Sequence, residues 1–413
     1  MNTITLDKKK IEFRDKIPNE PEWIYGARVK AWDYYTSSPL PDRAQHLWRY
    51  SDPSNFLFEK PERLIKPFPQ KSHSNLFRVK LEGEQNNNII IKDLHSAVAE
   101  NSDLLNRYLG KAIGGDFGKF EALNFAAWQE GLLIYIPDNT IIERPISIQW
   151  EFPKNDFLGR LLVVIGNNSK VTIVDNYSSH PNNKTAMLNN AVELFADDNS
   201  EVKYINIQNL SMDSRSYLTQ RAQVGAKSKL STFFALLGGK TSKLDIGTII
   251  EGEGSEALMS GFLLADNKQQ FDVHTVHHHK AADSNSNLDY KVILKDKACS
   301  SYTGLIRIEQ DAPDCEAYQE NRNLLLGNGV NSRSIPELEI LNQEVSCSHG
   351  ATMGPVDPEM IYYLNSRGIP TTDAERMIIE GFIEPTFNEI PEEPKELIRR
   401  LFFGKLEGEE NGR

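Results

Sequence analysis

Short apolar runs separated by breaks of polar and small residues fill the chain from about Gly131 to Ala351. The runs include Leu132–Ile136, Leu161–Ile165, Val171–Val174, Val202–Ile207 and Tyr290–Leu294. Four similar breaks recur at roughly 27 to 31 residues, namely Asn168–Val171, Asn199–Val202, Lys227–Leu230 and Gly254–Ala257. Later breaks, near 297–300, 313–316, 329–332 and 343–346, come about 15 or 16 residues apart, half of that interval. A period of this size indicates stacked structural repeats.

The repeats predict a mainly β fold. Two strands in a turn of roughly 30 residues describe a parallel β-helix or a related solenoid, in which each coil stacks only on its neighbours. A Greek-key sandwich would place strands about every 8 to 12 residues, and no alternation of strands and helices supports a doubly wound sheet. We therefore predict a β-helix core over residues 126–354.

Residues 1–125 are rich in aromatic residues and have a mostly helical pattern. One helix is expected within Glu20–Trp32. A second is expected within Asp93–Leu109, where apolar residues recur near the helical period of 3.6. The polar stretch Ser72–Asn88 between them is expected to be a loop. These residues are predicted to form an N-terminal helical region.

Residues 355–413 are predicted to form a C-terminal helical domain. Asp357 is placed to cap a helix that begins with Pro358, and Gly368 to end it. A second helix is expected to begin near Thr372, and a third covers Pro394–Phe403, followed by a disordered tail over 404–413. Helical pieces at both termini make physical sense, because a solenoid needs its open ends covered.

Composition narrows the function classes. The chain has 413 residues and a formal net charge of −12, which argues against nucleic acid as the main partner. No run of about 18 apolar residues is present, and the N-terminus lacks the apolar segment of a signal peptide. The three cysteines form no CxxC pair, which favours free thiols in a reducing compartment. We expect a cytoplasmic protein that does not contact a membrane.

Cys347 and His349 are the candidate metal ligands. They lie two residues apart where a strand is predicted, so their side chains should share one face. A thiolate is a soft ligand and an imidazole a borderline one, so both side chains could reach one metal or one partner surface. A closed site would need further ligands from elsewhere.

Three other patterns carry weaker signals. His274, His277, His278 and His279 should alternate between two faces, so a hydrogen bond to Asp272 or Asp283 is a more economical interpretation than a metal site. Gly238–Thr241 resembles a phosphate-binding loop but has Phe234 where that motif needs glycine, so ATP hydrolysis is not expected. The acid pairs Glu251/Glu253 and Asp311/Asp314 could suit a carbohydrate-active β-helix enzyme, but solvated turns explain them more simply.

Several motifs resemble the SufB/SufD family, whose members are scaffold subunits of the SUF iron–sulfur cluster assembly system. The residues that carry the resemblance are Gln269, Asp272, His274-Thr275, His279, Gly304, Ile306, Pro336-Glu-Leu-Glu-Ile340, Cys347-Ser-His-Gly-Ala-Thr352 and Ser366-Arg-Gly-Ile369. The resemblance is specific over about 255–383. It implies a right-handed parallel β-helix flanked by helices, and a protein that is not an enzyme.

Two departures favour the SufD type within this family. Val330 stands where SufB is expected to carry a cysteine, and Cys347-Ser-His-Gly-Ala-Thr352 replaces the typical Glu-His-Glu-Ala-Thr. The resemblance implies that His349 lies at the interface with a SufB-type subunit as a ligand of a transient iron–sulfur cluster, with Cys347 beside it. A stand-alone, homodimeric SufB-like scaffold is the alternative.

The resemblance also implies a second partner, the SufC-type ABC ATPase. This subunit would dock on the C-terminal helices, and the corresponding residues here are Arg367, Gly368, Ile369, Ala374, Gly381 and Phe382. Reduced flavin belongs to the assembled family complex, although no flavin motif is present in this chain.

Overall fold

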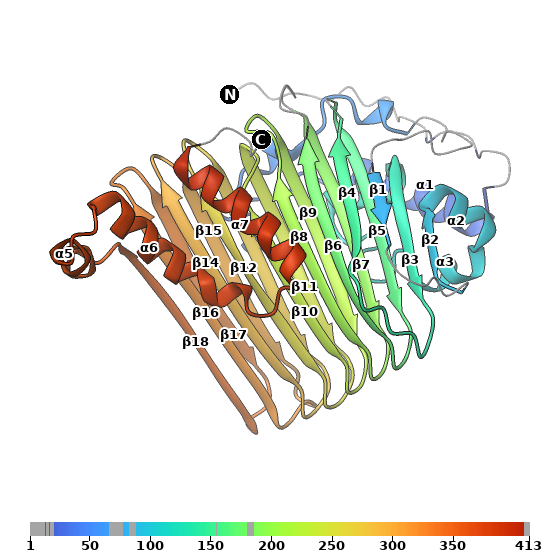
Figure 1. Cartoon of the computed structure of the whole chain (residues 1–413). Helices are drawn as coiled ribbons and strands as arrows, with labels where there is room; N and C mark the ends of the chain where they lie inside the picture. The colour runs from blue at the N-terminus through green and yellow to red at the C-terminus, as the bar shows by residue number, and fades with distance from the viewer. Residues whose placement is uncertain are drawn as a thin grey trace.

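The computed structural model describes residues 13, 16, 20–65, 77–81, 88–153, 155–179 and 186–408. Two nine-stranded sheets, sheet A and sheet B, dominate it (Figure 1). Sheet A contains, in spatial order, β1 (Phe77–Lys80), β4 (Ile146–Phe152), β6 (Lys170–Ser179), β8 (Glu201–Asn209), β10 (Lys229–Leu236), β12 (Glu256–Ala265), β14 (Asn285–Lys295), β16 (Cys315–Leu326) and β18 (Val345–Pro355). Sheet B contains β17 (Asn331–Ile340), β15 (Cys299–Ile308), β13 (Gln270–His279), β11 (Thr241–Ile250), β9 (Arg215–Val224), β7 (Met187–Ala196), β5 (Phe157–Ile165), β3 (Glu130–Ile136) and β2 (Ile90–Asp93).

From β3 onward the chain alternates between the sheets, and each strand pairs in parallel with the next strand of its own sheet. Leu230 of β10, for example, pairs with Val202 on one side and with Ala257 on the other. This topology confirms the mainly β solenoid that the repeat predicted. The strands are buried on both faces over much of their length, which explains why they read as apolar runs and not as strict alternation.

The sequence period comes from one corner of the solenoid. At this corner each turn before the last has one residue with a left-handed backbone, a conformation that favours Asn, Asp and Gly: Asn139, Asn168, Asn199, Lys227, Gly254, Asp283 and Asp314. A small buried residue follows each of them: Thr140, Ser169, Ser200, Ser228, Ser255, Ser284 and Cys315. These side chains bond between turns, as where Ser228 Oγ accepts from the Ser200 amide at 3.0 Å.

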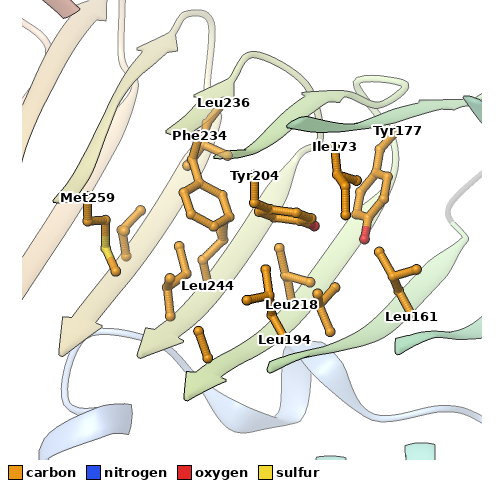
Figure 2. Close-up of a cluster of buried hydrophobic side chains, with 14 of the residues drawn as sticks. Leu161, Ile173, Tyr177, Leu194, Tyr204, Leu218, Phe234, Leu236, Leu244 and Met259 are labelled. Carbon is orange, nitrogen blue, oxygen red and sulfur yellow. The ribbon is translucent and has the colours of Figure 1, made fainter. Parts of the chain in front are cut away.

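Two hydrophobic layers flank the solenoid interior. Figure 2 shows the interior, where Tyr204 and Phe234 of sheet A face Leu218 and Leu244 of sheet B. The N-terminal region covers part of the outer face of sheet B through a second cluster that includes Tyr217. The C-terminal helices cover sheet A through a third cluster (Figure 1).

The N-terminal region contains both expected helices. They are α1 (Glu22–Ser37) and, where one helix was expected, the pair α2 (Leu94–Glu100) and α3 (Ser102–Tyr108). The region also holds α4 (Lys119–Ala127) and the short 3₁₀ helices η1 (His46–Trp48), η2 (Pro53–Phe56) and η3 (Pro61–Arg63). The loop expected over Ser72–Asn88 is wrong in part, because β1 lies within it and pairs antiparallel with β4. Residues 72–76 and 82–87 of that stretch lie outside the described residues.

The C-terminal helices are α5 (Pro358–Ser366), α6 (Thr371–Ile383), η4 (Glu384–Phe387) and α7 (Glu392–Glu407). As expected, Asp357 caps α5 by accepting from the Glu359 amide, and Gly368 follows the helix with φ +84°. The disordered tail expected from 404 onward is wrong as far as 408, because α7 continues to Glu407 and Lys405 Nζ donates to Gln269 Oε1 at 2.5 Å. Residues 409–413 lie outside the described part. No described helix is long and apolar enough to span a membrane.

Candidate functional site at the open end of the solenoid

The two ends of the solenoid differ. At the N-terminal end, β1 and β2 pair antiparallel with β4 and β3 and cover the sheet edges. At the C-terminal end, β17 and β18 are the last strands of sheets B and A, and within the described residues no strand pairs with their outer edges. In Figure 1, β18 forms the left margin of the solenoid. An uncovered edge of this kind is a template for pairing with another chain.

Cys347 and His349 lie in β18 on the face that points toward the solenoid interior. Cys347 is the register partner of Ala317, and His349 is the partner of Gln319. Ala317 and Gln319 are both buried interior residues of β16. The sequence-based expectation of a shared face is therefore confirmed, while the ligand role of the pair stays a prediction.

The two candidate ligands differ in environment. Cys347 is half-buried against a small apolar cluster that includes Ile306 and Cys315. Burial, together with the nearby Cys315 thiol, raises the pKa of Cys347, so this thiol is protonated at neutral pH. His349 is exposed. Binding a metal through Cys347 would thus release a proton, because the thiolate is the ligand.

The described residues of this chain do not bring together enough ligands to close a metal site. Among the described residues, no group of three or more His, Cys, Asp or Glu side chains is arranged to hold a metal ion. A cluster at this end would therefore need ligands from a second chain or from free thiols. The positions of Cys347 and His349 suit a site in which this chain supplies only part of the ligand set.

Large exposed apolar side chains gather near the same end. They include Leu338, Leu341 and Met353 of the last turn, Met360, Tyr362 and Tyr363 of α5, and Met377 of α6. Tyr362 is 76% exposed, and α5 buries none of its residues. Figure 1 shows α5 beyond the β18 margin. Several large apolar side chains exposed in one region are typical of an interaction surface.

The candidate docking residues of the C-terminal helices occupy different environments. Arg367, Gly368 and Gly381 are exposed, and the Arg367 guanidinium lies 5.2 Å from the Tyr363 ring centre. Ile369 is half-buried. Ala374 is fully buried, and Phe382 packs on the cluster that joins these helices to sheet A. The exposed residues can meet a partner directly, whereas Ala374 and Phe382 hold α6 against the rest of the chain.

The histidine run divides between two faces, as its alternation predicted. His277 and His279 are buried inside the solenoid, whereas His274 and His278 lie on the outer face of β13. The expected hydrogen bonds to Asp272 or Asp283 are wrong. His274 bonds Asp245 at 2.9 Å and His278 bonds Glu309 at 2.7 Å.

The expected partner Asp272 is already engaged. Its carboxylate accepts from Ser51 Oγ at 2.5 Å and from Lys243 Nζ at 2.9 Å, which ties the N-terminal region to sheet B. Inside the solenoid, His279 bonds the hydroxyls of Ser284 and Ser286, each at 2.8 Å. These contacts hold the fold together and do not converge on a metal.

The remaining patterns lie in turns. Gly238 and Gly239 form the corner between β10 and β11, where an added Cβ at Gly238 would lie 2.1 Å from the Leu210 amide nitrogen. Val330 packs against the main core just before β17. The four acids of the two candidate carboxylate pairs are exposed in connecting turns: Glu251, Glu253, Asp311 and Asp314. Glu251 pairs with Lys280 at 3.3 Å.

One residue of the open end was not predicted from the sequence. Gln319 lies in an alternating run of β16, and no motif marks it. Only the strand register reveals that it sits beside His349 inside the solenoid.

Comparison with known proteins gives a consistent result. The family model described as the SufBD core domain of SUF system FeS cluster assembly matches residues 152–382, and the SufBD N-terminal region model matches 74–148. The iron–sulfur cluster assembly protein SufD of Bacillus subtilis is 32% identical, with 94% of this chain and 95% of the relative covered. SufB of the same organism is 25% identical over 98% of this chain and 93% of its own length.

A SufBD family protein of Staphylococcus haemolyticus is 27% identical over 95% of this chain and 91% of its own length. Of the two B. subtilis paralogues, SufD is the more similar. The two family models together match residues 74–148 and 152–382, which contain the strands of both sheets. The chain belongs to the SufB/SufD family of iron–sulfur cluster assembly proteins.

Proposed function

We propose that this chain is a non-catalytic, SufD-type scaffold subunit that pairs with a SufB-type subunit through the open end of its solenoid. The observation that carries the proposal is the last turn, where β17 and β18 present free edges beside exposed apolar side chains. Strand edges give affinity through backbone hydrogen bonds, and the apolar side chains add buried area.

His349 and Cys347 would supply this chain's share of the ligands for a nascent iron–sulfur cluster, which is the cargo of the scaffold. Thiolates are the usual cluster ligands, and imidazole replaces them in some clusters. His349 is accessible for binding, whereas the protonated, half-buried Cys347 needs the metal's charge to ionise. A SufB-type partner would complete the ligand set across the interface.

A SufC-type ABC ATPase would dock on the exposed turn Arg367–Ile369 and on α5. The C-terminal helices pack on sheet A through the cluster that contains Ile379 and Phe402, so a force on them reaches the last strands of the solenoid. ATP binding by the partner would then shift the open end and expose the ligands. Reduced flavin would serve the assembled complex as a source of electrons, and we assign it no residue here.

A homodimeric, SufB-like scaffold is the second candidate. The free edges of β17 and β18 suit a second copy of the chain as well, because a two-fold dimer uses one surface twice. Two Cys347 thiols would then meet at the interface. This form predicts cluster binding by the purified homodimer that is lost in Cys347→Ser.

The test of the cluster role is His349→Ala in the reconstituted complex. We expect cluster formation, followed by visible absorption and by iron content, to fall severalfold while assembly of the complex is unchanged. His278→Ala is the matched control, since it removes a histidine from the outer face of the neighbouring sheet. Undiminished cluster formation in His349→Ala would remove His349 from the ligand set.

A further inference from the structure

The solenoid interior holds buried polar side chains in its last turns as well as apolar ones. In the middle turns it is filled by residues such as Leu218, Phe234 and Leu244 (Figure 2). In the last turns, several buried polar side chains have atoms without a hydrogen-bond partner among the described residues: His277, Tyr290, Ser300, Gln319 and Ser334. A buried polar group left without a partner costs about 1–3 kcal/mol, so such groups call for an explanation.

Gln319 is the one of these residues that adjoins the candidate site. It is 3% exposed, and neither its amide oxygen nor its amide nitrogen has a partner within the described chain. Gly304, on the facing sheet, leaves the space that the amide occupies. A Cβ built on Gly304 would lie 2.3 Å from Gln319 Nε2, so any larger residue would displace the amide.

The register places this amide beside the candidate ligand. Gln319 and His349 are direct partners in the parallel ladder between β16 and β18, and both lie on its inward face. Neighbouring strands run about 4.8 Å apart, so side chains stacked in this way are within reach of each other. The imidazole is exposed on its other side, where a partner or a cluster would approach.

We infer that Gln319 is a positioning residue for His349, which rests on the proposed function of His349 as a ligand. When the imidazole turns inward, Gln319 Oε1 accepts a hydrogen bond from one ring N–H, and this contact gives the buried amide oxygen a partner. The bond fixes one neutral tautomer and leaves the other ring nitrogen free to bind iron. Ligating histidines commonly hold such an acceptor behind the ring, and it sets both ring orientation and basicity.

The test reads the imidazole itself in the full-length chain without metal. The ¹⁵N chemical shifts of the His349 ring, assigned with His349→Ala, report which ring nitrogen carries the proton. Gln319→Leu removes the acceptor at similar volume and should shift the tautomer balance. Gln319→Glu keeps an acceptor oxygen behind the ring and should retain the wild-type tautomer balance.

Gln220→Leu is the matched control. Gln220 is also a fully buried interior glutamine with neither amide atom partnered in the described structure, but it lies in β9, far along the solenoid. It should leave the His349 signals unchanged. If Gln319→Leu fails to fold, Gln319→Met decides, because it keeps the length of the side chain and removes the amide oxygen.

The outcomes separate this inference from the proposed function. An unchanged tautomer balance of His349 in the variant that lacks the amide oxygen overturns the positioning role, even if His349→Ala abolishes cluster formation. Shifted signals together with full cluster formation by His349→Ala support the contact but remove the ligand role. The same signal change in Gln220→Leu would assign the effect to general core loosening and overturn the inference.

Discussion

Arg160 and Glu193 form an ion pair 2.7 Å apart with both side chains completely buried between sheet B and the N-terminal region. The Glu193 carboxylate also accepts from the backbone amides of Gly110, Ala112 and Ile113, each at 3.0 Å. One side chain of the solenoid thus holds the loop that follows α3. The N-terminal region is fastened by specific polar contacts as well as by apolar burial.

Glu193→Leu should destabilise the chain strongly. It leaves the buried Arg160 charge and three backbone amides without their acceptor, and removing one partner of a buried pair costs about 3–5 kcal/mol. Urea denaturation measures the loss, and hydrogen exchange should show the amides of 110–113 losing protection first. Glu256→Leu is the control, because its pair with Lys229 is 38% exposed on each side and should cost under about 1 kcal/mol. Equal losses in the two variants would contradict the anchoring role.

Asp175 should make stability fall as the pH rises from about 4 to 6. Burial raises the pKa of Asp175 to about 6 from 3.8, although it accepts bonds from Trp150 Nε1 and the Tyr204 hydroxyl. Because the folded pKa lies above the unfolded one, its favourable contribution is complete below pH 3.8 and is lost as pH rises through 6.

Asp175→Asn removes this titration. Urea denaturation across pH 4 to 8 should show wild type losing free energy of unfolding relative to the variant up to about pH 6 and then a constant difference. A difference that does not depend on pH would show that Asp175 has the same pKa in the folded and unfolded chain.

His277 should act with the opposite sign. It is fully buried, and burial lowers its pKa to about 3 from 6.5. Its contribution to stability is therefore complete above pH 6.5 and is lost as the pH falls toward 3. His277→Leu should lose less stability than wild type over this range in the same denaturation series. Parallel curves would mean that His277 has the same pKa in the folded and the unfolded chain.

The C-terminal turn offers a test of ATPase docking. Arg367→Glu reverses an exposed charge at the turn after α5 without touching the core, and it should weaken binding of a SufC-type ATPase tenfold or more if this is a hot spot. Biolayer interferometry with the purified ATPase measures the change. Lys170→Glu, an exposed charge near the other end of sheet A, should bind normally. Unaltered affinity in Arg367→Glu would place the docking site elsewhere.

The features that could be predicted from the sequence are those that depend on residues close together in the chain. The repeated breaks in the sequence correspond to residues such as Asn168 and Asn199, which adopt a left-handed backbone where the chain turns into a strand of sheet A. The shared face of Cys347 and His349 follows from the period of two along a strand. The cap at Asp357 and the stop at Gly368 follow from helix-end chemistry.

The features that the sequence did not predict depend on contacts between residues that are far apart in the sequence. The partner of His274 is Asp245, 29 residues away on the neighbouring strand, which no local pattern shows. Gln319 likewise gains its position from the register of β16 against β18. The last turn of α7 is held by the hydrogen bond from Lys405 to Gln269 of the solenoid, although the sequence after 404 is polar and rich in glycine, as in a disordered tail. Tertiary context decided each case.

We propose that this chain works as one subunit of a scaffold that also contains SufB-type and SufC-type proteins. The most direct measurement is light scattering after size exclusion of the chain combined with SufB-type and SufC-type proteins from the same source. We expect a stable complex with one copy of this chain, one SufB-type subunit and two ATPases. A self-dimer that ignores the SufB-type protein would contradict it.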